Sequence, residues 1–113
     1  MAYTELPVRT RGVCCELEPA PEPAELGAAV EVLKALADPT RLSMVVTLRK
    51  HEEPVCICDL VAVYALGQPT ISHHMRVLRD AGLIESEKRG LWRFYTLRRD
   101  LPPAIRRLID DIA

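Results

Sequence analysis

The 113-residue sequence has no long hydrophobic run. Its apolar stretches are far shorter than the roughly 18 residues that a membrane-spanning helix needs, so we expect no membrane segment. Residues 1–15 lack an apolar core flanked by basic residues, so we expect no signal peptide and a cytoplasmic location. No internal repeat is visible, and the length suits a single domain.

The sequence also lacks the patterns of a thiol enzyme. It has four cysteines but no CxxC motif, and a domain of this size leaves little room for a substrate cleft. We therefore expect neither an enzyme nor an organic cofactor. Because cytoplasmic thiols stay reduced, the four cysteines favour metal binding or redox sensing over disulfides.

The chain does have an uneven distribution of charge. The net charge is −1, yet residues 1–67 carry 6 basic and 10 acidic side chains, whereas residues 68–107 carry 9 basic and 4 acidic ones. A near-neutral chain with one basic half is typical of a small nucleic-acid-binding protein.

Hydrophobic periodicity and turn residues predict a mainly α (α+β) fold. Residues 1–21, with three prolines, predict a flexible tail that carries Cys14 and Cys15, and residues 22–113 predict the folded domain. Polar residues 51–55 predict a loop, Arg89-Gly90 a hairpin turn, and Asp100 the cap of the last helix. The expected elements are helices over 25–37, 39–50, 56–64 and 68–81, strands over 83–88 and 91–97, and a helix over 101–112. This α-α-α-α-β-β-α order is the winged helix-turn-helix layout.

The helix expected over 68–81 has the character of a DNA recognition helix. Ile71, Met75 and Leu78 recur at i, i+4 and i+7 and anchor one face in the core. On the other face, Gln, Thr and Ser can reach base edges, while Arg and His can pair with phosphates, and the hairpin adds further basic groups. The predicted DNA-binding residues are Gln68, Thr70, Ser72, His73, His74, Arg76, Lys88, Arg89 and Arg93.

Some of these residues also have a purely structural interpretation. His74 fits a partly buried, hydrogen-bonded histidine as well as it fits a DNA contact. Trp92 and Tyr95 are expected to pack the hairpin onto the domain and not to stack on bases.

Three segments together resemble the ArsR/SmtB family of bacterial metal-responsive repressors. They read DPTRL at 38–42, QPTISHH at 68–74 and GLWRFY at 90–95. The resemblance implies a homodimer through the first and last helices, which binds double-stranded operator DNA and releases it when metal binds. Two positions depart from the family pattern: Ala65 replaces the usual turn Gly, and Gly67 replaces a Ser cap. Ala65 is unfavourable if that position needs a positive φ.

Residues Cys56-Ile57-Cys58-Asp59-Leu60 resemble the CVCDL arsenic-binding segment of the family's arsenite repressors. The third cysteine of that segment is Val61 here, and the resemblance implies that the tail pair, Cys14 and Cys15, fills the gap. Trivalent arsenic is soft and takes three thiolates in a pyramid. Residues i and i+2 of a regular helix point about 200° apart. We therefore expect only one of Cys56 and Cys58 to be a ligand, and favour Cys56 at the helix cap.

The predicted function is thus a transcriptional repressor with arsenite, As(III), as its inducer and Sb(III) as a related ligand. The alternatives within the same fold are a thiol redox or persulfide sensor and a cadmium- or lead-responsive repressor. Residues 100–113 contain no histidine, so the zinc site that other family members carry on the last helix is not expected.

Overall fold

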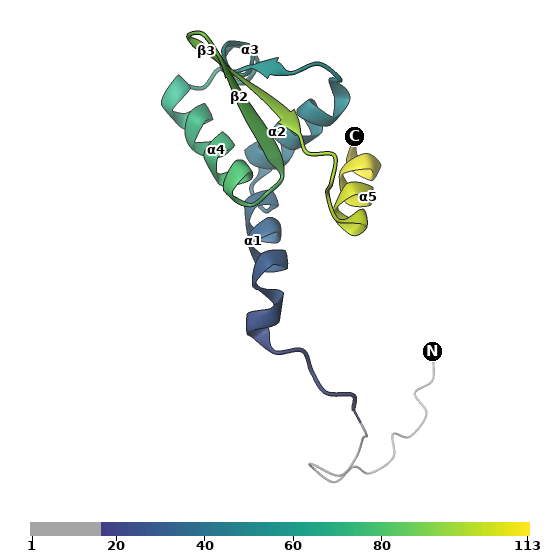
Figure 1. Cartoon of the computed structure of the whole chain (residues 1–113). Helices are drawn as coiled ribbons and strands as arrows, with labels where there is room; N and C mark the ends of the chain where they lie inside the picture. The colour runs from purple at the N-terminus through teal and green to yellow at the C-terminus, as the bar shows by residue number, and fades with distance from the viewer. Residues whose placement is uncertain (1–16) are drawn as a thin grey trace, which may run out of the picture.

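The computed structural model describes residues 17–113 and gives a mainly α winged helix-turn-helix (Figure 1). The predicted tail cysteines, Cys14 and Cys15, lie outside the described residues. The elements are a 3-10 turn η1 (Pro23–Leu26), helices α1 (Gly27–Leu36), α2 (Pro39–Lys50), α3 (Ile57–Tyr64), α4 (Gln68–Asp80) and α5 (Pro103–Ile112), and strands β1 (Val55–Cys56), β2 (Ile84–Arg89) and β3 (Trp92–Leu97). The predicted fold is confirmed, with one additional strand.

Local signals set the boundaries of the helix-turn-helix. Asp38 caps α2, because its carboxylate accepts a 2.9 Å hydrogen bond from the Arg41 N–H. That bond, with smaller contributions from the charges of Arg41 and His74, lowers the pKa of Asp38. Between α3 and α4, Ala65 adopts a left-handed conformation with φ 53°. The sequence comparison with the family pattern therefore identified a position that does require positive φ.

The prediction of a loop over 51–55 is wrong at its end. Val55 pairs with Tyr95, and Cys56 pairs with Phe94, so β1 joins the hairpin in an antiparallel sheet of order β1-β3-β2. A two-residue strand is too short to produce an alternating pattern, which explains why the sequence does not indicate it. This pairing holds Cys56, the residue before α3, against the central strand β3.

Two other boundaries differ from the prediction. The hairpin turn is Gly90-Leu91, one residue later than predicted, because Arg89 still pairs with Trp92. Gly90 has φ 61°, which glycine adopts without strain. The predicted cap of the last helix is also wrong: α5 begins at Pro103, and Asp100 instead accepts two 2.9 Å hydrogen bonds from Arg98.

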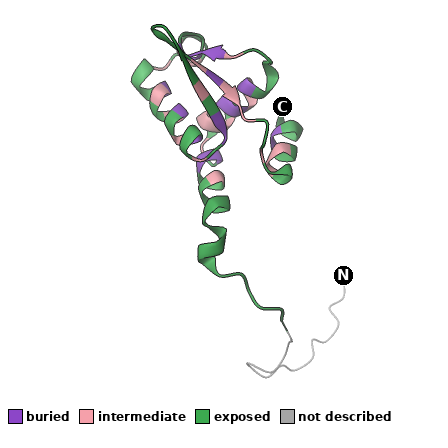
Figure 2. Cartoon of the chain, in the orientation of Figure 1, coloured by how far each residue is buried: buried purple, intermediate pink, exposed green. Residues whose placement is uncertain are grey.

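The core lies where α2, α3, α4, α5 and the sheet meet, while most of α1 lies outside it (Figure 2). Met44, Leu60 and Ile71 are among its fully buried side chains. Helix α1 projects from the domain, and only Ala35 and Leu36 at its end are buried. In the described part of the chain, no helix is both long and apolar enough to cross a bilayer.

Candidate functional site

Helix α4 is held on the domain by the face that periodicity predicted. Ile71, Met75 and Leu78 are at most 1% exposed, and α4 packs against α3, α1, α2 and β2. The opposite face is open to solvent and carries most of the predicted DNA-binding residues of the helix. Gln68, Thr70, His73 and Arg76 are exposed, and Ser72 is half-buried. The helix thus presents polar side chains that suit base edges and phosphates.

His74 occupies a different environment from its neighbour His73. It is half-buried, and its Nδ1 atom is buried without a hydrogen-bonding partner among the described residues. Of the two histidines, His73 is therefore the one that faces solvent.

The wing formed by β2 and β3 presents the other predicted DNA-binding residues. Lys88, Arg89 and Arg93 are all exposed. Arg89 donates a 3.0 Å hydrogen bond to Glu87, which lowers the pKa of that carboxyl, and its guanidinium lies 4.9 Å from the centre of the Phe94 ring. These contacts hold Arg89 near the tip of the wing.

The two aromatic residues that were expected to pack the hairpin behave differently. Tyr95 is 4% exposed, as predicted. Trp92 is 54% exposed, so the prediction that it packs onto the domain is wrong. Side chains alternate along a strand, and Trp92 is the first residue of β3, directly after the hairpin turn.

The thiols of Cys56 and Cys58 lie next to each other at the start of α3. Cys56 is the N-cap of the helix, and its Sγ accepts a 3.4 Å hydrogen bond from the Cys58 N–H and a 2.8 Å one from the Cys58 thiol. The expectation that these side chains point apart is wrong. Cys56 has extended backbone angles, φ −71° and ψ 143°, so the 100° helical rotation per residue does not apply to it.

The two thiols differ in exposure and proton affinity. Cys56 is buried between the sheet and α3, whereas Cys58 is exposed. The hydrogen bond to Cys56, reinforced by desolvation and by the negative charge of Asp59, raises the pKa of Cys58. An incoming ligand would therefore meet Cys58 first. Within residues 17–113, the structure has no cluster of three or more Cys, His, Asp or Glu side chains that could hold a metal ion.

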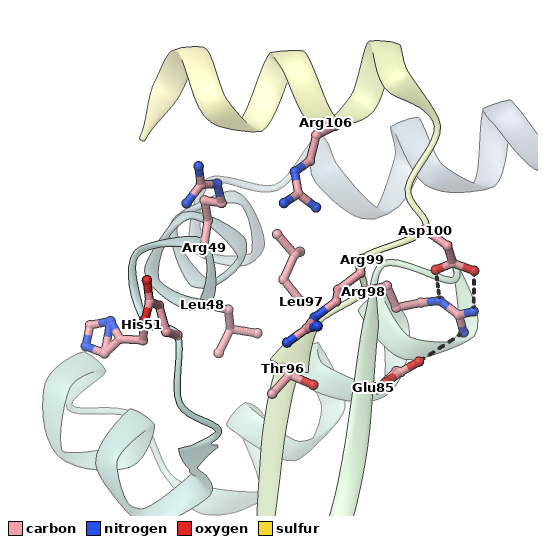
Figure 3. Close-up of a pocket in the computed structure, with 11 residues that line it drawn as sticks. Leu48, Arg49, His51, Glu85, Thr96, Leu97, Arg98, Arg99, Asp100 and Arg106 are labelled. Atoms are coloured by element: carbon pink, nitrogen blue, oxygen red, sulfur yellow. Dashed lines mark hydrogen bonds and ion pairs between the residues drawn. The ribbon is translucent and has the colours of Figure 1, made fainter.

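A cleft of about 760 Å³ lies between the end of α2, the end of β3 and α5 (Figure 3). Its charged groups largely compensate one another. Arg98 pairs with Asp100 and lies 4.0 Å from Glu85, and Arg49 pairs with Asp110 at 2.6 Å. The cleft lies at the opposite end of the hairpin from the turn at Gly90, so it is separate from the surface formed by α4 and the wing tip.

Comparisons with known proteins agree with this geometry. Residues 38–86, from the cap of α2 into β2, match the family model described as bacterial regulatory protein, arsR family. The chain is 38% identical over 84 residues to an HTH-type transcriptional regulator of Methanocaldococcus jannaschii, which covers 74% of this chain and 93% of that protein. It is also 38% identical to the arsenical resistance operon repressor of Escherichia coli, covering 73% of this chain and 69% of that one.

Solved structures show the same architecture. The transcriptional repressor PagR of Bacillus anthracis superposes with a TM-score of 0.65 at 26% sequence identity, over 81% of this chain and all of that one. The sequence relatives, the family match and the recognition helix beside a wing lead to one assignment. The chain belongs to the ArsR family, as a winged helix-turn-helix transcriptional repressor.

Proposed function

We propose that this repressor senses arsenite through thiolates at the start of α3 and releases its operator when arsenite binds. The observation that carries the proposal is that the thiols of Cys56 and Cys58 lie side by side at the first turn of α3. Two thiolates on one ion, with bonds of about 2.3 Å, lie about 3.5 Å apart, so a small adjustment of the first turn brings both into one coordination sphere. The names of relatives such as the Escherichia coli arsenical resistance operon repressor support this ligand class.

The chemistry needs a third thiol. Arsenous acid, As(OH)₃, condenses with three thiols, forming three As–S bonds and releasing three water molecules. Cys56 and Cys58 supply two of these thiols. Cys14 and Cys15 are the remaining cysteines of the chain, and we assign the third ligand to this pair. Arsenite binding would then tie the N-terminal tail to the start of α3.

The position of the thiols explains how binding could reach the DNA. Helix α3 packs directly against the recognition helix α4, and Cys56 is also paired with Phe94 at the base of the wing. A change at the first turn of α3 therefore acts on both DNA-facing elements. A coupling of about 3 kcal/mol would weaken operator binding more than 100-fold, near the top of the usual range for allosteric proteins.

A DNA-binding titration tests the proposal. The probe is a duplex that the reduced protein selects from a random-sequence pool, and anisotropy is followed as arsenite is added. We expect release by the wild type and its loss in Cys58→Ser and in the double variant Cys14→Ser/Cys15→Ser. Release of DNA by the double variant at the wild-type arsenite concentration would show that the tail supplies no ligand.

The same assay separates arsenite from the alternative signals. Antimonite should act like arsenite, whereas peroxide tests the redox alternative, and cadmium and lead test the divalent-metal alternative. Cadmium must displace thiol protons, and the raised pKa of Cys58 means that its affinity should climb with pH, by about tenfold per unit for each protonated ligand. Arsenite releases water and no protons, so its binding should change little between pH 6 and 8.

A further inference from the structure

A continuous groove separates the recognition helix from the wing. Two adjoining clefts of about 190 and 180 Å³ form it, and both are lined by Ser72, Arg93 and Tyr95. The outer cleft, near the start of α4, also includes Gln68 and Trp92. The inner cleft extends along α4 toward its C-terminus.

The inner cleft is strongly cationic. It is lined by Arg76, Arg79 and Arg93 and by no acidic residue. The nearest acidic partner is Asp80, 3.4 Å from Arg79, and both side chains of that pair are largely exposed, so water screens their attraction. Among the described ion pairs, none engages Arg76 or Arg93.

Two residues with hydroxyl groups, Ser72 and Tyr95, line the same cleft. Arg93 donates a 3.2 Å hydrogen bond to Ser86 on the neighbouring strand, which holds its guanidinium beside the sheet. Burial raises the pKa of Tyr95, and the positive charges of Arg93, Arg79 and Arg76 oppose that rise. Tyr95 and the three arginines line the same cleft, where a phenol hydroxyl can donate a hydrogen bond.

The shape of duplex DNA indicates what fills such a groove. A recognition helix in the major groove and a wing directed at the adjacent minor groove lie on either side of one sugar-phosphate strand. From Gln68 to Arg79 the helix rises about 16 Å. A DNA strand advances about 3.4 Å along the axis per phosphate, so the groove is long enough for several consecutive phosphates.

We propose that the inner groove, formed by Arg76, Arg79, Arg93 and the Tyr95 hydroxyl, is a phosphate-binding site for the DNA strand that passes between α4 and the wing. This inference rests on the DNA-binding part of the proposed function and is independent of the inducer. It adds Arg79 and Tyr95 to the DNA-binding residues. Phosphate contacts carry no base information but fix the register of the recognition helix.

The test is the salt dependence of binding by the full chain without arsenite, measured with the selected duplex. Arg79→Gln should weaken binding about tenfold and reduce the slope of log K against log salt by about 1 for each protomer that contacts DNA. Arg79→Lys keeps the charge and should restore most of the slope. Tyr95→Phe removes a neutral donor, so it should weaken binding with the slope unchanged.

The matched control is Arg107→Gln, which removes the same charge from the exposed face of α5, away from this groove. Circular dichroism and thermal melting verify that each variant is folded. If Arg79→Gln and Arg107→Gln lose the same affinity and slope, the groove does not bind phosphate. If instead the wild type selects no duplex at all, the DNA-binding function itself fails, a result distinct from the first.

Discussion

Ala65 occupies a conformation that glycine usually adopts. Its φ of 53° ends α3 in the left-handed region, where a Cβ costs about 1 kcal/mol. We expect Ala65→Gly to raise the free energy of unfolding by about 0.5–1 kcal/mol, measured by urea denaturation.

The chain offers an internal control for this prediction. Ala62 is an exposed residue within α3, so Ala62→Gly makes the same chemical change where the backbone is helical. It should lower stability by about 0.5–1 kcal/mol. Equal signs for the two variants would mean that strain at Ala65 does not limit stability.

The thiol pair shows where residue spacing stops being informative. The sequence identifies Cys56 as a helix cap, and the structure confirms it. The prediction that the side chains of Cys56 and Cys58 point apart was wrong, because a cap residue has non-helical backbone angles. A helical rotation per residue applies only from the first helical residue, Ile57, onward.

At the scale of elements, the hydroxyl of Tyr64 connects α3 to α2. It lies 2.9 Å from both Ser43 Oγ and Thr47 Oγ1. Because Cys56 and Tyr64 lie at opposite ends of α3, this contact anchors the end of the helix away from the thiols. A change at the thiols should then pivot α3 about its C-terminal end.

We expect Tyr64→Phe to lower the free energy of unfolding by about 1 kcal/mol, because both hydroxyl contacts to α2 are lost. A double-mutant cycle with Thr47→Val isolates the contact by urea denaturation. The expected coupling is about 0.5–1 kcal/mol. Additive effects of the two substitutions would indicate that the hydroxyl does not connect the helices.

Most of the elements, but not all of their ends, are predictable from the sequence. Helix α4 has a strong apolar period and a proline in its first turn, and its start was predicted to within one residue. Strand β1 exists only through its partner β3, and Asp100 had two competing roles, as a cap or as a partner of Arg98. Neither the presence of β1 nor the role of Asp100 can be predicted without knowing which residues lie next to each other in the folded chain.

The candidate sites were predictable to the same extent. Residues on the outward face of α4 and at the wing tip follow from periodicity. The groove between them does not, because Arg79 and Tyr95 come from separate elements and line one cleft only when the hairpin packs against α4. Tyr95 carried a clear core signal, and its place in the lining of the cleft is a property of the packed domain.

At the scale of the whole molecule, several exposed apolar side chains of the described residues lie near the two ends of the domain sequence. Leu26 at the end of η1 is 46% exposed, Val30 and Leu33 on α1 are 40% and 55% exposed, and Leu108 and Ile112 on α5 are 42% and 46% exposed. These are the first and last helices, which the family resemblance assigns to a homodimer interface. We infer that a second copy covers these side chains and that the dimer sets the spacing of two recognition helices about one DNA turn apart.

Leu33→Glu tests this assembly. It places a charge among the exposed apolar residues of α1, and because Leu33 is 55% exposed in the single chain, the fold should persist. An unpaired charge in a buried interface should raise the dimer dissociation constant about 100-fold, measured by sedimentation equilibrium.

Val63→Glu on α3, where Val63 is 71% exposed, makes a similar change outside the proposed interface and should leave the dimer intact. Operator affinity should fall with the dimer, because one protomer engages only one half-site. A Leu33→Glu protein that remains dimeric at micromolar concentration would place the interface elsewhere.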